Sequence, residues 1–115
     1  MLRMNTAGDG LVYASLIQGY EELVKKNGYA DFFRTAYVNR WGHCTYSLAE
    51  LLVSIDVVIE RIKSGKWPDT SPAALNKRGK LLDPQGKVNF FEYVGVQKYN
   101  RTWVPNAKDY LGVSQ

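Results

Sequence analysis

The chain has 115 residues and a mass of 13.1 kDa, so it holds at most one domain. Hydrophobic residues make up 45% and charged residues 23%, which is ordinary for a folded protein and excludes a disordered or fibrous chain. The formal net charge is +4, but the 15 lysines and arginines are spread without a run of five like charges, so no nucleic-acid partner is expected.

The composition leaves the cellular compartment open. The single cysteine, Cys44, excludes an intrachain disulfide, yet many secreted enzymes need none. No apolar stretch reaches the roughly 18 residues of a membrane span, so none is expected. The first residues, 1–4, lack the long apolar region of a signal peptide, although a missing upstream segment could carry one.

The first part of the chain predicts a strand, a turn and a helix. Residues 1–6 are short and extended in character, and the glycine-rich residues 7–10 indicate a turn. From about 13 to 26 the apolar residues recur with helical spacing, and lysines followed by Gly28 mark the end of that helix. The apolar positions of this helix are Leu16, Tyr20, Leu23 and Val24.

The second part repeats the order of strand, loop and helix. Residues 34–39 are rich in β-forming types and predict a strand, which the loop 40–46 follows. Ser47 and Glu50 have the spacing of a capping box, and Gly65 and Pro68 end the helix that it opens. One apolar stripe runs along this helix: Leu48, Leu51, Leu52, Ile55, Val58, Ile59 and Ile62.

Beyond Pro68 the pattern weakens. A short helix is expected from Ser71 to Leu75, followed by a polar, turn-rich stretch over 80–87. Residues 88–96 are aromatic but alternate poorly, so a strand there stays open, and 99–115 is expected to run irregularly over a surface. The expected organisation is a βαβα portion over 1–75 and an aromatic tail over 76–115 that packs on it.

This order predicts an α/β fold. Two strands joined by a helical crossover are expected to lie parallel with a right-handed connection. Parallel strands are usually covered on both faces, and two short ones make a poor independent sheet. The wide apolar stripe of the second helix also needs a large partner, which indicates that the chain is part of something bigger.

Two residues at the ends of the strands could carry chemistry. His43 is the only histidine and follows the second strand, and Asp9 follows the first strand between two glycines. Taken singly, each is more often structural: a surface histidine, and an aspartate that caps a helix or forms a turn. Taken together they end consecutive βα units, so adjacent parallel strands would bring them to one edge of the sheet, where open α/β sheets place catalysts.

Three segments resemble α/β-hydrolases. Residues 6–12, TAGDGLV, resemble the segment around the catalytic acid of that family. Residues 37–50, YVNRWGHCTYSLAE, resemble the segment around the histidine of microbial members, and 62–68, IKSGKWP, resembles the exit of their last helix. The resemblance extends over about residues 2–75. It implies a partial α/β-hydrolase fold, formed by the last parallel strands with their crossover helices, with Asp9 as triad acid and His43 as base.

The resemblance implies a serine hydrolase that cleaves ester or peptide bonds through an acyl-enzyme. In this family the nucleophile precedes the acid and the histidine, but the chain has no Gly-x-Ser-x-Gly segment. The nucleophile is therefore expected upstream in the same enzyme or on a partner chain. The alternative is a non-catalytic module, derived from a hydrolase, that binds a partner through the apolar stripe.

Three residues near His43 could take part in a site. Trp41 and Tyr46 flank it and are candidates for substrate binding, although packing is the commoner role of aromatic residues. Cys44 is a poor candidate nucleophile, because adjacent side chains generally point apart. One histidine and one cysteine do not make a zinc site without carboxylates, so neither a metal nor another cofactor is expected.

Overall fold

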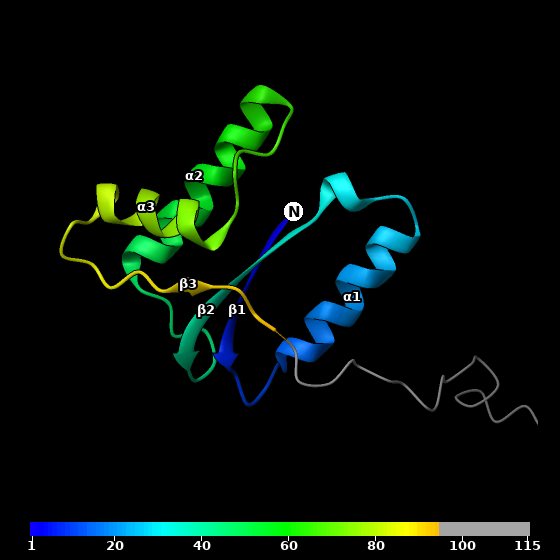
Figure 1. Ribbon diagram of the computed structural model, residues 1–115, viewed down its shortest axis with the longest axis horizontal. Helices are drawn as coiled ribbons and strands as arrows, with labels where there is room; N and C mark the ends of the chain where they lie inside the picture. The colour runs from blue at the N-terminus through cyan, green and yellow to red at the C-terminus, as the bar shows by residue number, and fades with distance from the viewer. Residues whose placement is uncertain (95–115) are drawn as a thin grey trace, which may run out of the picture.

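The computed structural model describes residues 1–94 and shows a mixed α/β arrangement. The expected irregular run over 99–115 lies outside the described residues. Three helices and a mixed three-stranded sheet form the described part (Figure 1), together with a 3-10 turn at Ala30–Phe32. In chain order the helices and strands are β1 (Leu2–Gly8), α1 (Ala14–Lys26), β2 (Arg34–Trp41), α2 (Leu48–Ser64), α3 (Pro72–Leu82) and β3 (Phe90–Phe91).

The sheet has the order β1-β2-β3. As expected, β1 and β2 are parallel, whereas the short β3 joins β2 antiparallel. Both long strands extend two residues beyond the ends expected at 6 and 39. The reason is a bulge: Thr6 pairs with Val38 and Gly8 with Trp41, so β2 contains one extra residue and the glycine-rich end of β1 stays paired.

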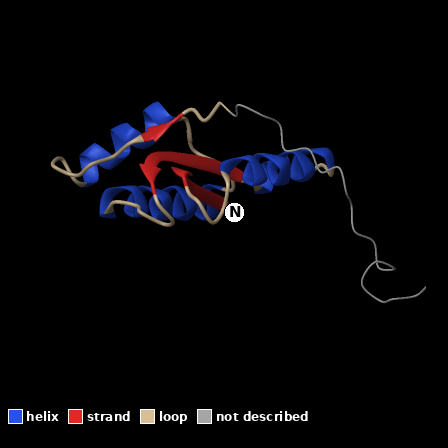
Figure 2. Ribbon diagram, turned by 90° about the horizontal axis from the view of Figure 1, so that it is seen from below, coloured by secondary structure: helices blue, strands red, loops and turns tan. Residues whose placement is uncertain are grey.

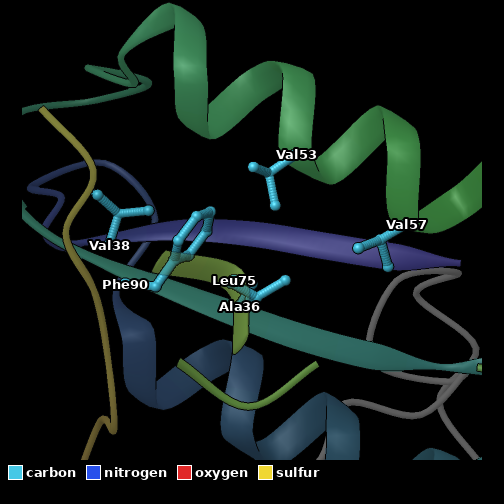
Figure 3. Close-up of a cluster of buried hydrophobic side chains, with 6 residues drawn as sticks. All are labelled: Ala36, Val38, Val53, Val57, Leu75 and Phe90. Atoms are coloured by element: carbon cyan, nitrogen blue, oxygen red, sulfur yellow. The ribbon is translucent and has the colours of Figure 1, made fainter. Parts of the chain in front are cut away.

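Helices lie on both faces of the sheet (Figure 2). On one face Tyr37 of β2 packs with Ala14 and Ile17 of α1. Its neighbours in the strand point the other way, as strand geometry requires. There a core of six buried side chains joins β2, α2, α3 and β3 (Figure 3). These residues are Ala36, Val38, Val53, Val57, Leu75 and Phe90.

Local signals explain where α2 begins and ends. The Ser47 hydroxyl accepts the Glu50 N–H, and the Glu50 carboxylate accepts the Ser47 N–H, which confirms the capping box. Gly65 closes the helix at φ 72°, in the left-handed region that glycine enters without strain.

The third helix is longer than the sequence suggests. It was expected to end at Leu75 but continues to Leu82, so the turn-rich stretch begins later than residue 80. Tertiary packing sustains it: Leu75 and Gly79 are both buried. A Cβ added at Gly79 would lie 2.7 Å from the Val88 side chain, so this glycine allows the segment before β3 to approach the helix. The division into a portion over 1–75 and a tail over 76–115 stays a prediction.

The side of α2 that faces the core is not its apolar stripe. Within the described chain the helix buries Ala49, Glu50, Val53, Ser54 and Val57. Most of the apolar stripe is exposed: Leu48, Leu51, Leu52, Ile55, Ile59 and Ile62. On α2 the apolar residues that join the core, Val53 and Val57, are smaller than the leucines and isoleucines of the stripe. Helix α1 also forms as expected, and it leaves Leu16, Tyr20 and Leu23 exposed within the described chain.

Within residues 1–94, none of the helices combines the length and the apolar character that a bilayer crossing requires.

Candidate acid–base site

Asp9 and His43 meet at the carboxyl edge of the parallel strands. Asp9 directly follows β1, and His43 lies two residues after β2. Nδ1 of His43 is 2.8 Å from Oδ2 of Asp9, although the two residues are 34 positions apart. The side chains therefore lie together as the order of the strands predicts. Their catalytic role remains a prediction.

The carboxylate of Asp9 is held by its own turn. Its Oδ1 atom accepts the N–H groups of Leu11 and Val12 at 2.8 and 3.0 Å, which leaves Oδ2 for His43. The Val12 N–H is the largest influence that lowers the pKa of Asp9, followed by the Leu11 N–H and then His43; burial opposes them without reversing the shift. Asp9 is thus a carboxylate at neutral pH, and the N–H groups of its own turn orient it independently of the imidazole.

The loop that carries His43 is tied to the end of β1. The Gly42 N–H donates to the Gly8 carbonyl, and the Thr6 hydroxyl donates to the Gly42 carbonyl at 2.6 Å. Gly42 has φ 96° and Cys44 has φ 55°, so the backbone is in the left-handed region on both sides of the histidine. A glycine at 42 is required by this geometry.

The imidazole has one engaged and one open nitrogen. An imidazole whose Nδ1 lies against a carboxylate keeps its proton there, so the lone pair of Nε2 is available to accept another. Within residues 1–94 no hydrogen bond uses Nε2, and the His43 side chain is 45% exposed, whereas that of Asp9 is 3% exposed. This arrangement of a buried acid behind a partly exposed base can perform general base catalysis on a group that binds at Nε2.

A partly buried ion pair joins β2 and α2 on either side of the same loop. Glu50 is fully buried, and its carboxylate contacts Nε and Nη2 of Arg40 at 3.1 Å each. The carboxylate also accepts the N–H groups of Ser47 and Asn89. The sequence identifies Glu50 only as a capping residue. No local spacing signals the pairing with Arg40, because the contact depends on how α2 sits on the sheet.

The two aromatic candidates have different environments. Trp41 is 87% exposed, and its ring lies so close to Gly8 that an added Cβ would be 2.5 Å from it. Tyr46 is half-buried and packs against the core between the sheet and α2, and this burial raises the pKa of Tyr46 to about 12. Tyr46 thus has a packing role, and substrate binding by either residue stays a prediction.

Three of the described serines hold local structure. The hydroxyls of Ser47 and Ser71 cap α2 and α3, and that of Ser54 donates to the Glu50 carbonyl. Cys44 is exposed and free. In the part of the chain that the structure describes, histidine, cysteine and acidic residues form no group of three that could hold a metal ion.

The sequence is similar to part of a known amidase. The o-phthalyl amidase of Xanthobacter agilis is 36% identical over 107 residues, which cover 91% of this chain but 24% of that protein. The chain thus spans about a quarter of the length of the curated relative that it matches. An amidase is a hydrolase, so the likeness is consistent with a hydrolase fragment. No family model matches the chain, and no solved structure matches it significantly.

Proposed function

We propose that this chain is the acid–base portion of a serine hydrolase with a partial α/β-hydrolase fold. His43 would take the proton of a serine hydroxyl as it attacks a carbonyl carbon, and would return it to the leaving group. Asp9 would hold the ring in the required tautomer and stabilise the imidazolium. The observation that carries the proposal is the 2.8 Å contact between Nδ1 and Oδ2, with Nε2 left open at the carboxyl edge of the sheet.

The substrate class follows from the same chemistry. A serine activated in this way forms an acyl-enzyme with esters, peptides or other amides. The name of the similar protein indicates that it acts on amides of the o-phthalyl type. For this chain we propose an amide or ester of a small acyl group as the substrate. Trp41, exposed beside the loop of His43, would contact that group.

The nucleophile would come from a segment outside this chain, either upstream in the same enzyme or on a partner. Two surfaces support such a neighbour. The strand β1 lies at the edge of the sheet, so one side of it is unpaired within the described residues. Beside it, an apolar groove runs between β1 and α2, lined mainly by Leu2, Met4, Leu51, Ile55, Val58 and Ile59. A further parallel strand and its helix would cover both surfaces.

The test is reconstitution followed by active-site labelling. The coding sequence upstream of Met1, and neighbouring genes, are read for a Gly-x-Ser-x-Gly segment, and the longer protein or the pair of chains is expressed. We expect a fluorophosphonate to label that serine and to leave the 115-residue chain unlabelled in an intact-mass measurement. Absence of any such segment, in frame or on a partner, would sink the proposal.

A matched set of variants then assigns the roles. Asp9→Asn should lower kcat about 10⁴-fold, because an uncharged side chain no longer selects the tautomer. Asp69→Asn is the control: the pKa of Asp69 is also lowered, chiefly by the backbone N–H of Ser71, but this carboxylate caps the segment before α3. Equal losses in both variants would contradict the assignment.

The second candidate is a non-catalytic module that binds a partner through α2. The exposed apolar stripe of that helix is as consistent with this module as with a portion of a larger enzyme. The two candidates differ in solution: an independent module should be a monodisperse, cooperatively folded monomer, whereas the portion of an enzyme should aggregate or require its other part.

A further inference from the structure

The loop of residues 42–47 carries His43 and connects β2 to α2. Arg40, near the end of β2, and Ser47, directly before α2, bind the same carboxylate. Arg40 contacts Glu50 through Nε and Nη2, and the Ser47 N–H donates to Oε2 of Glu50 at 2.7 Å. The distance that the loop must span is therefore set by one buried side chain.

We propose that Glu50, with Arg40, is a positioning residue for the Asp9–His43 pair. Glu50 acts as a clamp: its carboxylate holds the residues on the two sides of the loop together, and so it keeps the imidazole against Asp9. This inference rests on the proposed function for its significance in catalysis, but the geometry that it describes does not require the chain to be active.

Full use of the Glu50 carboxylate supports the clamp. Besides Arg40 and Ser47, its Oε1 atom accepts the Asn89 N–H at 2.9 Å, just before β3. Arg40 in turn donates to the Lys87 carbonyl at 2.7 Å through Nη2. The carboxylate thus joins the end of β2, the start of α2 and the approach to β3 in one network.

Stability alone is a weak reason to bury the Glu50 carboxylate beside the partly exposed Arg40. Removing a charge from water costs about as much as the attraction of its partner returns, and apolar residues of similar volume often stabilise a fold as well or better. An apolar pair does not fix the relative orientation of the two elements that it joins. A bidentate guanidinium and a carboxylate that also accepts an N–H from the helix end define a relative position of strand and helix, which is what a catalytic loop needs.

The experiment observes the only imidazole in the chain. In a uniformly ¹⁵N-labelled sample, long-range ¹H–¹⁵N spectra of His43 show which ring nitrogen carries the proton at a pH where the ring is neutral. Amide hydrogen exchange of residues 42–47 is measured in the same sample. The variants are Glu50→Gln, which keeps the shape and a hydrogen-bond acceptor, and Arg40→Lys, which keeps the charge but loses the fork of two donors.

The matched control is Glu60→Gln. It breaks an ion pair on the same helix, because Glu60 contacts Arg78 at 2.7 Å, but that pair is partly exposed and remote from the loop in sequence. Asp9→Asn provides the reference for an imidazole that has lost its acid.

We expect Glu50→Gln and Arg40→Lys to increase the exchange of loop amides about 10-fold or more, an opening eased by about 1.4 kcal/mol. The Nδ1–H tautomer should decline toward the level seen in Asp9→Asn, while Glu60→Gln matches the parent chain. Parent-like exchange and tautomer in a folded Glu50→Gln variant would overturn the clamp.

If Glu50→Gln does not fold, Arg40→Lys decides the matter by the same two readouts. Loss of folding in both variants would overturn the inference, because the pair would then serve the whole fold and not the loop. Failure of the proposed function looks different: the parent chain itself would lack the Nδ1–H tautomer, or Asp9→Asn would leave it unchanged, whatever the loop exchange shows.

Discussion

The hydroxyl of Thr6 donates a 2.6 Å hydrogen bond to the carbonyl of Gly42, and this bond ties the end of β1 to the loop that follows β2. Thr6 is fully buried, and it lies where the register between the two strands shifts. The bond therefore links the strand that leads to Asp9 with the loop that carries His43.

Replacing Thr6 by valine should destabilise the chain by about 1–3 kcal/mol, because the isosteric side chain leaves the Gly42 carbonyl with only the long 3.5 Å contact from the Thr45 hydroxyl. Urea unfolding followed by circular dichroism measures the change. Thr35→Val is the control, since its hydroxyl contacts Glu21 at 3.2 Å in a partly buried position and should cost less. A Thr6→Val variant as stable as the control would show that the bond contributes nothing.

Replacing Gly42 by alanine should strain the loop. The position has φ 96°, and an added Cβ would lie 3.0 Å from Cγ2 of Thr45, so a cost of about 1–2 kcal/mol is expected. Gly10→Ala is the matched control within the facing turn, where an added Cβ meets nothing within 4 Å. Thermal unfolding should separate the two variants, and equal midpoints would contradict the strain.

The pKa of Asp9 gives the fold an acid-dependent contribution to stability. Because the pKa in the folded chain lies below the ordinary 3.8, the carboxylate stabilises the fold above that value, and the contribution disappears as the pH falls through the folded pKa. Asp9→Asn should lack this part of the acid dependence. Denaturant unfolding at a series of pH values below about 5 measures it, and identical profiles for the two chains would refute the assignment.

His43→Gln should raise the pKa of Asp9 only in part. The Val12 N–H is the largest influence that lowers it, so the value should stay below 3.8 without the imidazole. A ¹³C titration of the aspartate carboxyl groups measures this, and a return to 3.8 in the variant would mean that His43 dominates.

The exposed face of α2 should accept charge without loss of folding. Ile55 and Ile59 are 56% and 43% exposed, so replacing both with lysine should change the stability of the isolated chain by about 0.5 kcal/mol or less per site and reduce its self-association. Val57→Lys is the contrast, because Val57 is fully buried and a charge there should unfold the chain. Sedimentation velocity with circular dichroism provides both measurements. Unfolding of the double variant would show that the stripe belongs to this chain's own core.

The sequence by itself determined the local elements and the pairing of the candidate residues. Capping residues, helix-ending glycines and apolar spacing are local signals, and they placed α1, the start and end of α2, and the first two strands to within two residues. The order of two βα units also predicted that Asp9 and His43 lie at one edge, because parallel neighbours end on the same side of a sheet.

Only the tertiary structure decided which faces are covered and what surrounds the loop. Periodicity shows that α2 has an apolar stripe, but it does not show that Val53 and Val57 are the residues that join the core. The length of α3 and the ion pair of Arg40 with Glu50 were likewise missed. Each depends on contacts between segments distant in sequence, and such contacts have no signature in local composition.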